Sequence, residues 1–213
     1  MASYFRATLE RFLVTPANEL LAELKLDPSR PVILFASKLQ GRKRCEDLLE
    51  AYKNLSPGMK PNPYLVIVGD GEERKALERR ASESGLDGVR FCGFRNQSEL
   101  PRFFDIASVF VLPSRHEPWG LIVNEVMNAG RAVIVSDEVG SQPDLITDGV
   151  EGCIFPAGDV EVLTVALRRV LATPQTAAQM GQRGLERIQH WGFEEDVRGL
   201  REAIARATKK ITA

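Results

Sequence analysis

Six short, mostly apolar runs, separated by longer segments in which apolar residues recur with a helical period, constrain the fold of this chain most strongly. Continuous apolar runs of this length are typical of parallel strands that are covered by helices on both sides. The predicted strands are residues 32–36, 64–68, 89–92, 107–112, 132–136 and 152–155. The alternation predicts an α/β fold with a doubly wound parallel sheet of about six strands.

Helical patterns before and after the strands divide the chain into three predicted parts. Thr15 followed by Pro16 is a favourable N-cap and first position, so residues 4–25 are expected to form two small helices. The last part of the sequence is helical in three segments, interrupted at Thr173-Pro174 and at Trp191-Gly192. We therefore expect an N-terminal helical segment at 1–30, a sheet domain at 31–195 and a C-terminal helix at 196–213.

Composition restricts the class of protein. Lys and Arg number 28 against 29 Asp and Glu, and the resulting net charge of −1 provides no basic field for nucleic acid. No apolar run approaches the ~20 residues that a membrane span needs. The cysteines, Cys45, Cys92 and Cys153, lack metal-binding spacing and predict buried thiols in a reducing cytoplasm. We expect a soluble, cytoplasmic, globular domain without a metal site.

Two glutamates separated by seven residues bracket the start of a predicted helix. Glu117 lies in the loop after the fourth predicted strand, and Glu125 lies about one turn into the helix that follows Gly120. The first helical amides and the positive end of the helix dipole form an anion site there. The two carboxylates could then accept hydrogen bonds from hydroxyls on either side of a phosphate. A solvated helix face with an acidic first turn explains the same pattern, so the motif alone leaves both interpretations open.

The loops after the other predicted strands carry further polar and glycine residues. Ligands of an open parallel sheet bind beyond the carboxyl ends of its strands, so these loops are expected to converge on one site. Lys38 and Lys43 follow the first strand and could offset the two charges of a pyrophosphate. Plain structural explanations stay open: surface lysines, a tight turn at 69–71, and a core position for Phe94. The remaining loop residues are Gly69-Asp70-Gly71, Gly93-Phe94-Arg95, Ser114 to Gly120 and Asp137 to Ser141.

The order and spacing of these motifs resemble those of retaining glycosyltransferases of family 4, whose GT-B fold consists of two facing Rossmann-like domains. Glu117 and Glu125 match the glutamate pair of that family. Lys38 and Lys43 keep the spacing of its basic pair, which clamps the pyrophosphate of the sugar donor. Ser37-Lys38 stands where many members have Gly-Arg, so a bidentate guanidinium contact is absent while the charge remains. Further matches, within residues 31–195, are Val68-Gly69-Asp70-Gly71, Phe91-Cys92-Gly93-Phe94, Leu112-Pro113-Ser114, and Gly140-Ser141-Gln142-Pro143-Asp144-Leu145-Ile146 followed by Gly149.

The resemblance implies a Rossmann-like domain of an enzyme that transfers a sugar from a UDP- or GDP-type nucleotide sugar to a hydroxyl acceptor. It further implies the hexosyltransferase type, retention at the anomeric carbon, a role in glycan, lipopolysaccharide or glycolipid synthesis, and no cofactor or metal. The residues that it assigns to catalysis are Lys38, Lys43 and Glu117. The residues that it assigns to binding the sugar nucleotide are Glu125, Gly120, Leu121, Ile122, Gly69, Gly93, Phe94, Arg95 and Ser114.

Length is the second strong constraint on function. At 213 residues the chain supports one domain with a sizeable core, whereas a GT-B enzyme needs two such domains. All the matched motifs belong to the C-terminal, donor-binding half. We therefore interpret the chain as that half, expect a missing N-terminal domain to bind the acceptor, and expect the isolated domain to be inactive. The full-length enzyme could associate peripherally with membranes. A non-catalytic nucleotide-sugar-binding or regulatory subunit and a GT-B-like sugar-nucleotide epimerase stay open as alternatives.

Overall fold

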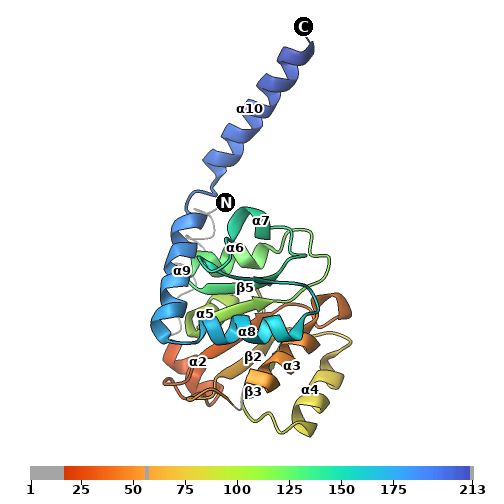
Figure 1. Ribbon diagram of the computed structural model, residues 1–213, viewed down its shortest axis with the longest axis vertical. Helices are drawn as coiled ribbons and strands as arrows, with labels where there is room; N and C mark the ends of the chain where they lie inside the picture. Colours follow the sequence, from red (N-terminus) through yellow and green to blue (C-terminus); the bar gives the residue numbers. More distant parts are fainter. Residues whose placement is uncertain (1–16, 56–57, 212–213) are drawn as a thin grey trace.

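A computed structural model describes residues 17–55 and 58–211 of the chain. The expected helix cap at Thr15-Pro16 and the first of the two expected small helices lie outside these residues, and the second helix is α2, Ala17–Glu23. The described part forms an α/β fold around one six-stranded sheet (Figure 1). Its strands are β1 Val32–Ala36, β2 Tyr64–Val68, β3 Val89–Gly93, β4 Val109–Leu112, β5 Ala132–Ser136 and β6 Gly152–Phe155.

The strand order β3-β2-β1-β4-β5-β6, with every pairing parallel, confirms the doubly wound sheet that the sequence predicts. The chain builds outward from β1 through β2 to β3 and then returns to place β4 on the other side of β1. The strand order therefore reverses between β1 and β4, which is where open sheets of this kind bind their ligands. Strand β4 begins two residues later than predicted, because the amide of Ala107 donates to Phe104 and ends the preceding helix.

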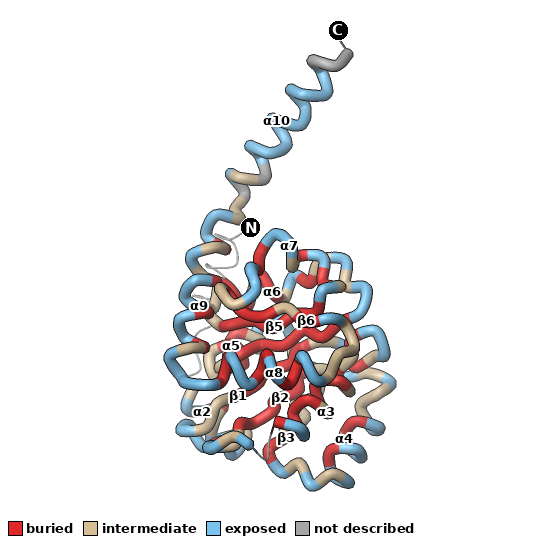
Figure 2. Tube along the Cα trace, in the orientation of Figure 1, coloured by how far each residue is buried: buried red, intermediate tan, exposed pale blue. Residues whose placement is uncertain are grey.

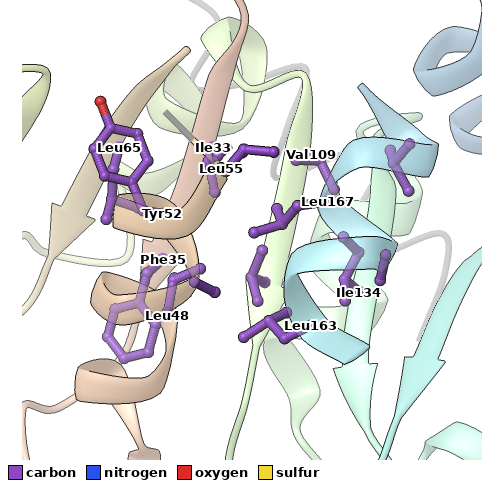
Figure 3. Packing of buried hydrophobic residues seen from close by; sticks show 14 of the residues in the cluster. Ile33, Phe35, Leu48, Tyr52, Leu55, Leu65, Val109, Ile134, Leu163 and Leu167 are labelled. Atoms are coloured by element: carbon purple, nitrogen blue, oxygen red, sulfur yellow. The ribbon is translucent and has the colours of Figure 1, made fainter. Parts of the chain in front are cut away.

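Helices cover both faces of the sheet, which explains why the strands read as continuous apolar runs. On one face, Ile33 and Phe35 of β1 pack in a cluster with residues of α3 (Cys45–Leu55), α4 (Arg74–Glu83) and α8 (Val160–Val170). Figure 3 shows Leu48 of α3 and Leu163 of α8 lying over the strands of this face. The alternate residues Val32 and Leu34 pack in a second cluster. That cluster also contains residues of α2, α5 (Leu100–Ile106), α6 (Leu121–Asn128) and α7 (Gln142–Leu145).

The C-terminal region forms three helices, as its sequence pattern predicts. These are α8, α9 (Pro174–Ile188) and α10 (Phe193–Ile211). Helix α9 packs beside β5 and α6, whereas α10 projects away from the domain and is largely exposed (Figures 1 and 2). Across the described part of the chain, none of the helices combines the length and apolarity that a membrane crossing requires. Cys45 and Cys153 are buried as expected, and Cys92 is only partly buried.

Candidate functional site

The loop after β1 and the loop after β4 meet at the point where the strand order reverses. The amide of Arg115 donates to the carbonyl oxygen of Arg42 at 2.7 Å and joins the two loops. The first loop contains the short 3-10 helix η1, Gly41–Lys43, and the second runs into α6. Residues that are distant in sequence are thereby brought together at the carboxyl edge of the sheet, as the parallel order predicts.

Lys43 and Glu117 form an ion pair between these loops. The Lys43 Nζ atom donates to Glu117 Oε2, and only 10% and 11% of the two side chains are exposed. Arg42 Nη1 lies 3.7 Å from the same carboxylate oxygen. Removing one partner of such a shielded pair leaves a charge without compensation, so each side chain fixes the position of the other. The sequence places both residues in the site, but it does not predict that they pair.

The backbone adopts left-handed conformations immediately beside this pair. Arg44, which follows Lys43, has φ of 52°, and His116, which precedes Glu117, has φ of 54°. These values are uncommon for residues other than glycine. The Arg44 guanidinium donates to both carboxylate oxygens of Asp47, at 2.7 and 2.8 Å, while the amide of His116 donates to Glu138 Oε2 at 3.1 Å. Side-chain contacts therefore hold the strained residues that present Lys43 and Glu117 to each other.

At the start of α6, two glycines lie so close to neighbouring residues that a side chain would not fit without a shift. Gly120 has φ of 83°, and a Cβ atom there would lie 3.1 to 3.3 Å from Leu112, Val139 and Glu117. A Cβ atom on Gly140 would lie 2.0 Å from the carbonyl oxygen of Pro118. The glycines therefore let the loop fold tightly against its neighbours. The first two helical amides, of Leu121 and Ile122, donate to no described residue, and Leu121 is exposed.

Glu125 lies one turn into α6 and is partly buried. Burial raises the pKa of its carboxyl group, and a hydrogen bond from Gln97 Nε2 to Oε1, at 3.4 Å, acts in the opposite direction. Gln97 comes from the segment after β3, and sequence reasoning did not select it. Asn124 of the same helix is buried and accepts a hydrogen bond from Trp119 Nε1 at 3.0 Å.

A separate cleft of 360 Å³ opens over the carboxyl ends of the first strands; we call it the β1–β3 cleft. Phe94 is 72% exposed at this cleft, which excludes the core position that the sequence left open for its ring. Lys38 is exposed there and makes no ion pair with the described residues. Arg95 also lines it, but its guanidinium donates to Glu99 and to the carbonyl oxygen of Cys92. Its other lining residues are Ala36, Ser37, Val68, Gly69, Asp70 and Leu100.

The turn at Gly69-Asp70-Gly71 supports the cleft by backbone contact. A Cβ atom on Gly69 would lie 1.9 Å from the carbonyl oxygen of Ser37, and the amide of Leu39 donates to the carbonyl oxygen of Asp70 at 2.9 Å. The amide of Gly69 in turn donates to the carbonyl oxygen of Gly93. Gly69 therefore lets the turn fit closely against Ser37 beneath the cleft, in agreement with the tight-turn explanation.

Ser114 lies behind the site and not at its surface. Ser114 is fully buried, and its hydroxyl oxygen has no hydrogen-bond partner among the described residues. Its carbonyl oxygen accepts a hydrogen bond from the Ser136 hydroxyl. His116 has an exposed side chain whose Nδ1 lies 3.1 Å from Glu138. Within residues 17–55 and 58–211, no three His, Cys, Asp or Glu side chains gather as a metal ion would require.

A doubly wound parallel sheet with the strand order β3-β2-β1-β4-β5-β6 defines a Rossmann-like domain. The sequence profile of the family described as glycosyl transferases group 1 matches residues 17–187. The chain belongs to this family.

Two relatives show the extent of the likeness. The lipopolysaccharide core biosynthesis glycosyltransferase LpsE of Rhizobium meliloti is 32% identical over 168 residues, which cover 78% of this chain and 47% of LpsE. A GDP-mannose-dependent alpha-(1-6)-phosphatidylinositol monomannoside mannosyltransferase of Mycolicibacterium smegmatis is 33% identical over 172 residues, which cover 78% of this chain and 44% of that enzyme. The chain thus spans less than half the length of either relative.

Solved structures agree on the fold. Sucrose-phosphate synthase from Thermosynechococcus elongatus matches with a TM-score of 0.75 at 29% identity, over 93% of this chain and 50% of that one. The C-terminal domain of the glycosyl transferase group 1 family protein LpcC from Francisella tularensis matches with a TM-score of 0.69 at 22% identity, over 79% of this chain and 90% of that domain. These neighbours confirm the predicted C-terminal half of a GT-B fold.

Proposed function

We propose that this chain is the donor-binding domain of a retaining, family 4 glycosyltransferase of the hexosyltransferase type. Its substrate would be a UDP- or GDP-type nucleotide sugar, and the complete enzyme would transfer the sugar to a hydroxyl acceptor. The observation that carries the proposal is the Lys43–Glu117 pair beside the open amides of α6. A cation, a carboxylate and an anion-binding helix end are there brought together at the switch point.

The phosphate-binding role follows from charge. As the glycosidic bond breaks, negative charge grows on the β-phosphate of the leaving nucleotide. Lys43, Lys38 and the amides of Leu121 and Ile122 would stabilise that charge more in the transition state than in the ground state. In this proposal the phosphate replaces Glu117 as the ion-pair partner of Lys43. The Glu117 carboxylate is then free to accept hydrogen bonds from the donor sugar.

The nucleoside would occupy the remaining surface. Glu125, oriented by Gln97, is an acceptor suited to the two hydroxyls of a ribose. The exposed ring of Phe94 offers a face on which a nucleobase can stack at the β1–β3 cleft. All the proposed contacts come from side chains and helix amides of the chain itself, so the proposal requires no cofactor and no metal.

The acceptor side of the reaction needs protein that this chain does not contain. In a complete enzyme a second domain would bind the acceptor, and closure of the two domains would position it against the sugar. We therefore propose that the isolated chain binds the sugar nucleotide but transfers no sugar. A cytoplasmic location, peripheral membrane association of the complete enzyme, and a role in glycan, lipopolysaccharide or glycolipid synthesis complete the proposal.

Calorimetric titration of the chain with UDP, GDP and the matching nucleosides tests the assignment. A Lys43→Ala variant is expected to lose about 1 to 3 kcal/mol of affinity for the diphosphate and much less for the nucleoside. Arg79→Ala on α4 is the matched control, because Arg79 is an exposed cation that pairs with Glu83 of the same helix and does not line the candidate site. Equal losses for diphosphate and nucleoside would show that Lys43 does not contact phosphate. Turnover by the purified chain would refute the proposed need for a second domain.

A further inference from the structure

A second cavity lies at the opposite edge of the sheet from the candidate donor site. It has a volume of 390 Å³ and is lined by residues that precede β1, β4 and β5, including Pro31, Ala107 and Arg131. Residues at the start of α9 complete the wall. We call it the amino-end cavity, because the amino ends of parallel strands share one edge of the sheet. Its volume lies within the range of about 300 to 1,000 Å³ that is typical of small-molecule sites.

The charged residues that line the amino-end cavity are all cationic. Its lining includes three cationic residues, Arg30, Lys60 and Arg131, and no aspartate or glutamate, although the whole chain has a net charge of −1. Arg30 is already engaged, because its guanidinium lies 3.8 Å above the Tyr64 ring and donates to the carbonyl oxygen of Asn62. Lys60 is exposed. The rest of the wall is mostly apolar, with prolines, alanines and Leu171.

Arg131 is the cation with unused hydrogen-bonding capacity. Its Nε atom is buried and has no partner among the described residues. One terminal nitrogen donates to the carbonyl oxygen of Ala107 at 3.4 Å, and the other lies 3.9 Å from Asp105 Oδ1. Burial lowers the pKa of Arg131 and raises the pKa of Asp105. For each group the cost of desolvation therefore exceeds the electrostatic attraction between the two, which are far apart for an ion pair.

We propose that the amino-end cavity binds a small amphipathic anion, whose phosphate or carboxylate group pairs with Arg131 and whose apolar part contacts the proline and alanine wall. The Arg131 side chain is 33% exposed, and its terminal nitrogens have only the long contacts to Ala107 and Asp105, so a charge-assisted hydrogen bond from them to the anion would replace weak contacts with a strong one. The site is separate from the candidate donor site and does not depend on the function proposed for it.

Nuclear magnetic resonance of the arginine Nε–H groups tests this proposal directly. The probes are phenyl phosphate, benzoate and inorganic phosphate, titrated to about 10 mM, the concentration at which a weak site of this kind fills. The Arg131 signal, assigned by its loss in Arg131→Lys, is expected to shift and saturate with phenyl phosphate, benzoate or both. Inorganic phosphate is expected to bind more weakly because it lacks the apolar part. An Arg131 signal that no probe moves would overturn the proposal.

Two variants give opposite predictions. Arg131→Gln is expected to weaken binding by about tenfold or more, because it removes the cation. Asp105→Asn is expected to strengthen binding by about threefold, because it removes the carboxylate that competes with the ligand for Arg131. Unchanged or weaker binding by Asp105→Asn would contradict the proposal, and this variant decides the question if Arg131→Gln does not fold. Lys43→Ala must leave the Arg131 titration unchanged, which separates this site from any phosphate bound at the donor site.

Discussion

Between β1 and β4 the candidate site is closed by side chains, whereas the β1–β3 cleft beside it is open. Lys43 and Glu117 compensate each other's charge with almost no exposure, while Lys38 and Phe94 face solvent. The closed part is held by an ion pair between loops, and the open part is held by backbone contacts under Lys38. We infer that a nucleotide could enter the cleft without displacing any contact, but that its phosphates would have to exchange with Glu117.

The largest expected effect concerns the backbone support of the cleft. Gly69→Ala is expected to destabilise the fold by about 4 kcal/mol, because its Cβ atom would lie 1.9 Å from a backbone oxygen in a conformation with φ of 139°. Gly85→Ala is the matched control: Gly85 has φ of 62° but nothing within 4 Å, so only about 1 kcal/mol of strain is expected. Urea unfolding measures both. Similar losses would show that the contact with Ser37 is unimportant.

Lys43→Ala is expected to destabilise the fold by about 3 kcal/mol, because Glu117 would keep a shielded charge without its nearest partner. Lys38→Ala is expected to change stability by less than about 0.5 kcal/mol, since its side chain is exposed. Replacing both members of the pair, Lys43→Met with Glu117→Leu, should recover much of the loss. The comparison of closed and open parts fails if Lys38→Ala and Lys43→Ala unfold at the same urea concentration.

Phe94→Ala separates binding from stability in the open cleft. Because its ring is exposed, the free energy of unfolding is expected to change by less than about 0.5 kcal/mol. Affinity for the nucleoside and for the nucleoside diphosphate should fall together, by about 1 to 2 kcal/mol, through the loss of stacking. Calorimetry on the two ligands measures this. A loss confined to the diphosphate would place the ring against phosphate and not against the base.

The smallest expected effect is the pH dependence contributed by Glu125. Burial raises its carboxyl pKa, so the folded protein retains this proton to higher pH than the unfolded chain does. Stability from this group is therefore full at low pH and decreases as the pH rises above the ordinary value of 4.5. Glu125→Gln should remove that decrease, which denaturation at several pH values detects. In the proposed function the Glu125 carboxylate binds the ribose, so the same variant should weaken nucleotide binding by about 1 to 2 kcal/mol.

Sequence alone located most of the strands and the general position of the site. Runs such as 32–36 and 132–136 match β1 and β5 at both ends, because strands buried on both faces must be apolar throughout. The convergence of the loops followed from the parallel order of the strands. Sequence was less informative about burial: it left a core position open for Phe94, although Phe94 is 72% exposed.

Tertiary structure alone decided which polar side chains meet. The Lys43–Glu117 pair joins residues 74 positions apart, and the Gln97–Glu125 contact joins residues 28 positions apart. Neither pairing has a local signal, because each depends on how two loops from different strands fold toward each other. The local sequence pattern therefore predicted the strands of the sheet and the edge at which the loops meet. The strands follow from burial on both faces, and the edge follows from their parallel direction. The contacts within that edge, and the long contact between Arg131 and Asp105 at the other edge, depend on distances that only the folded chain fixes.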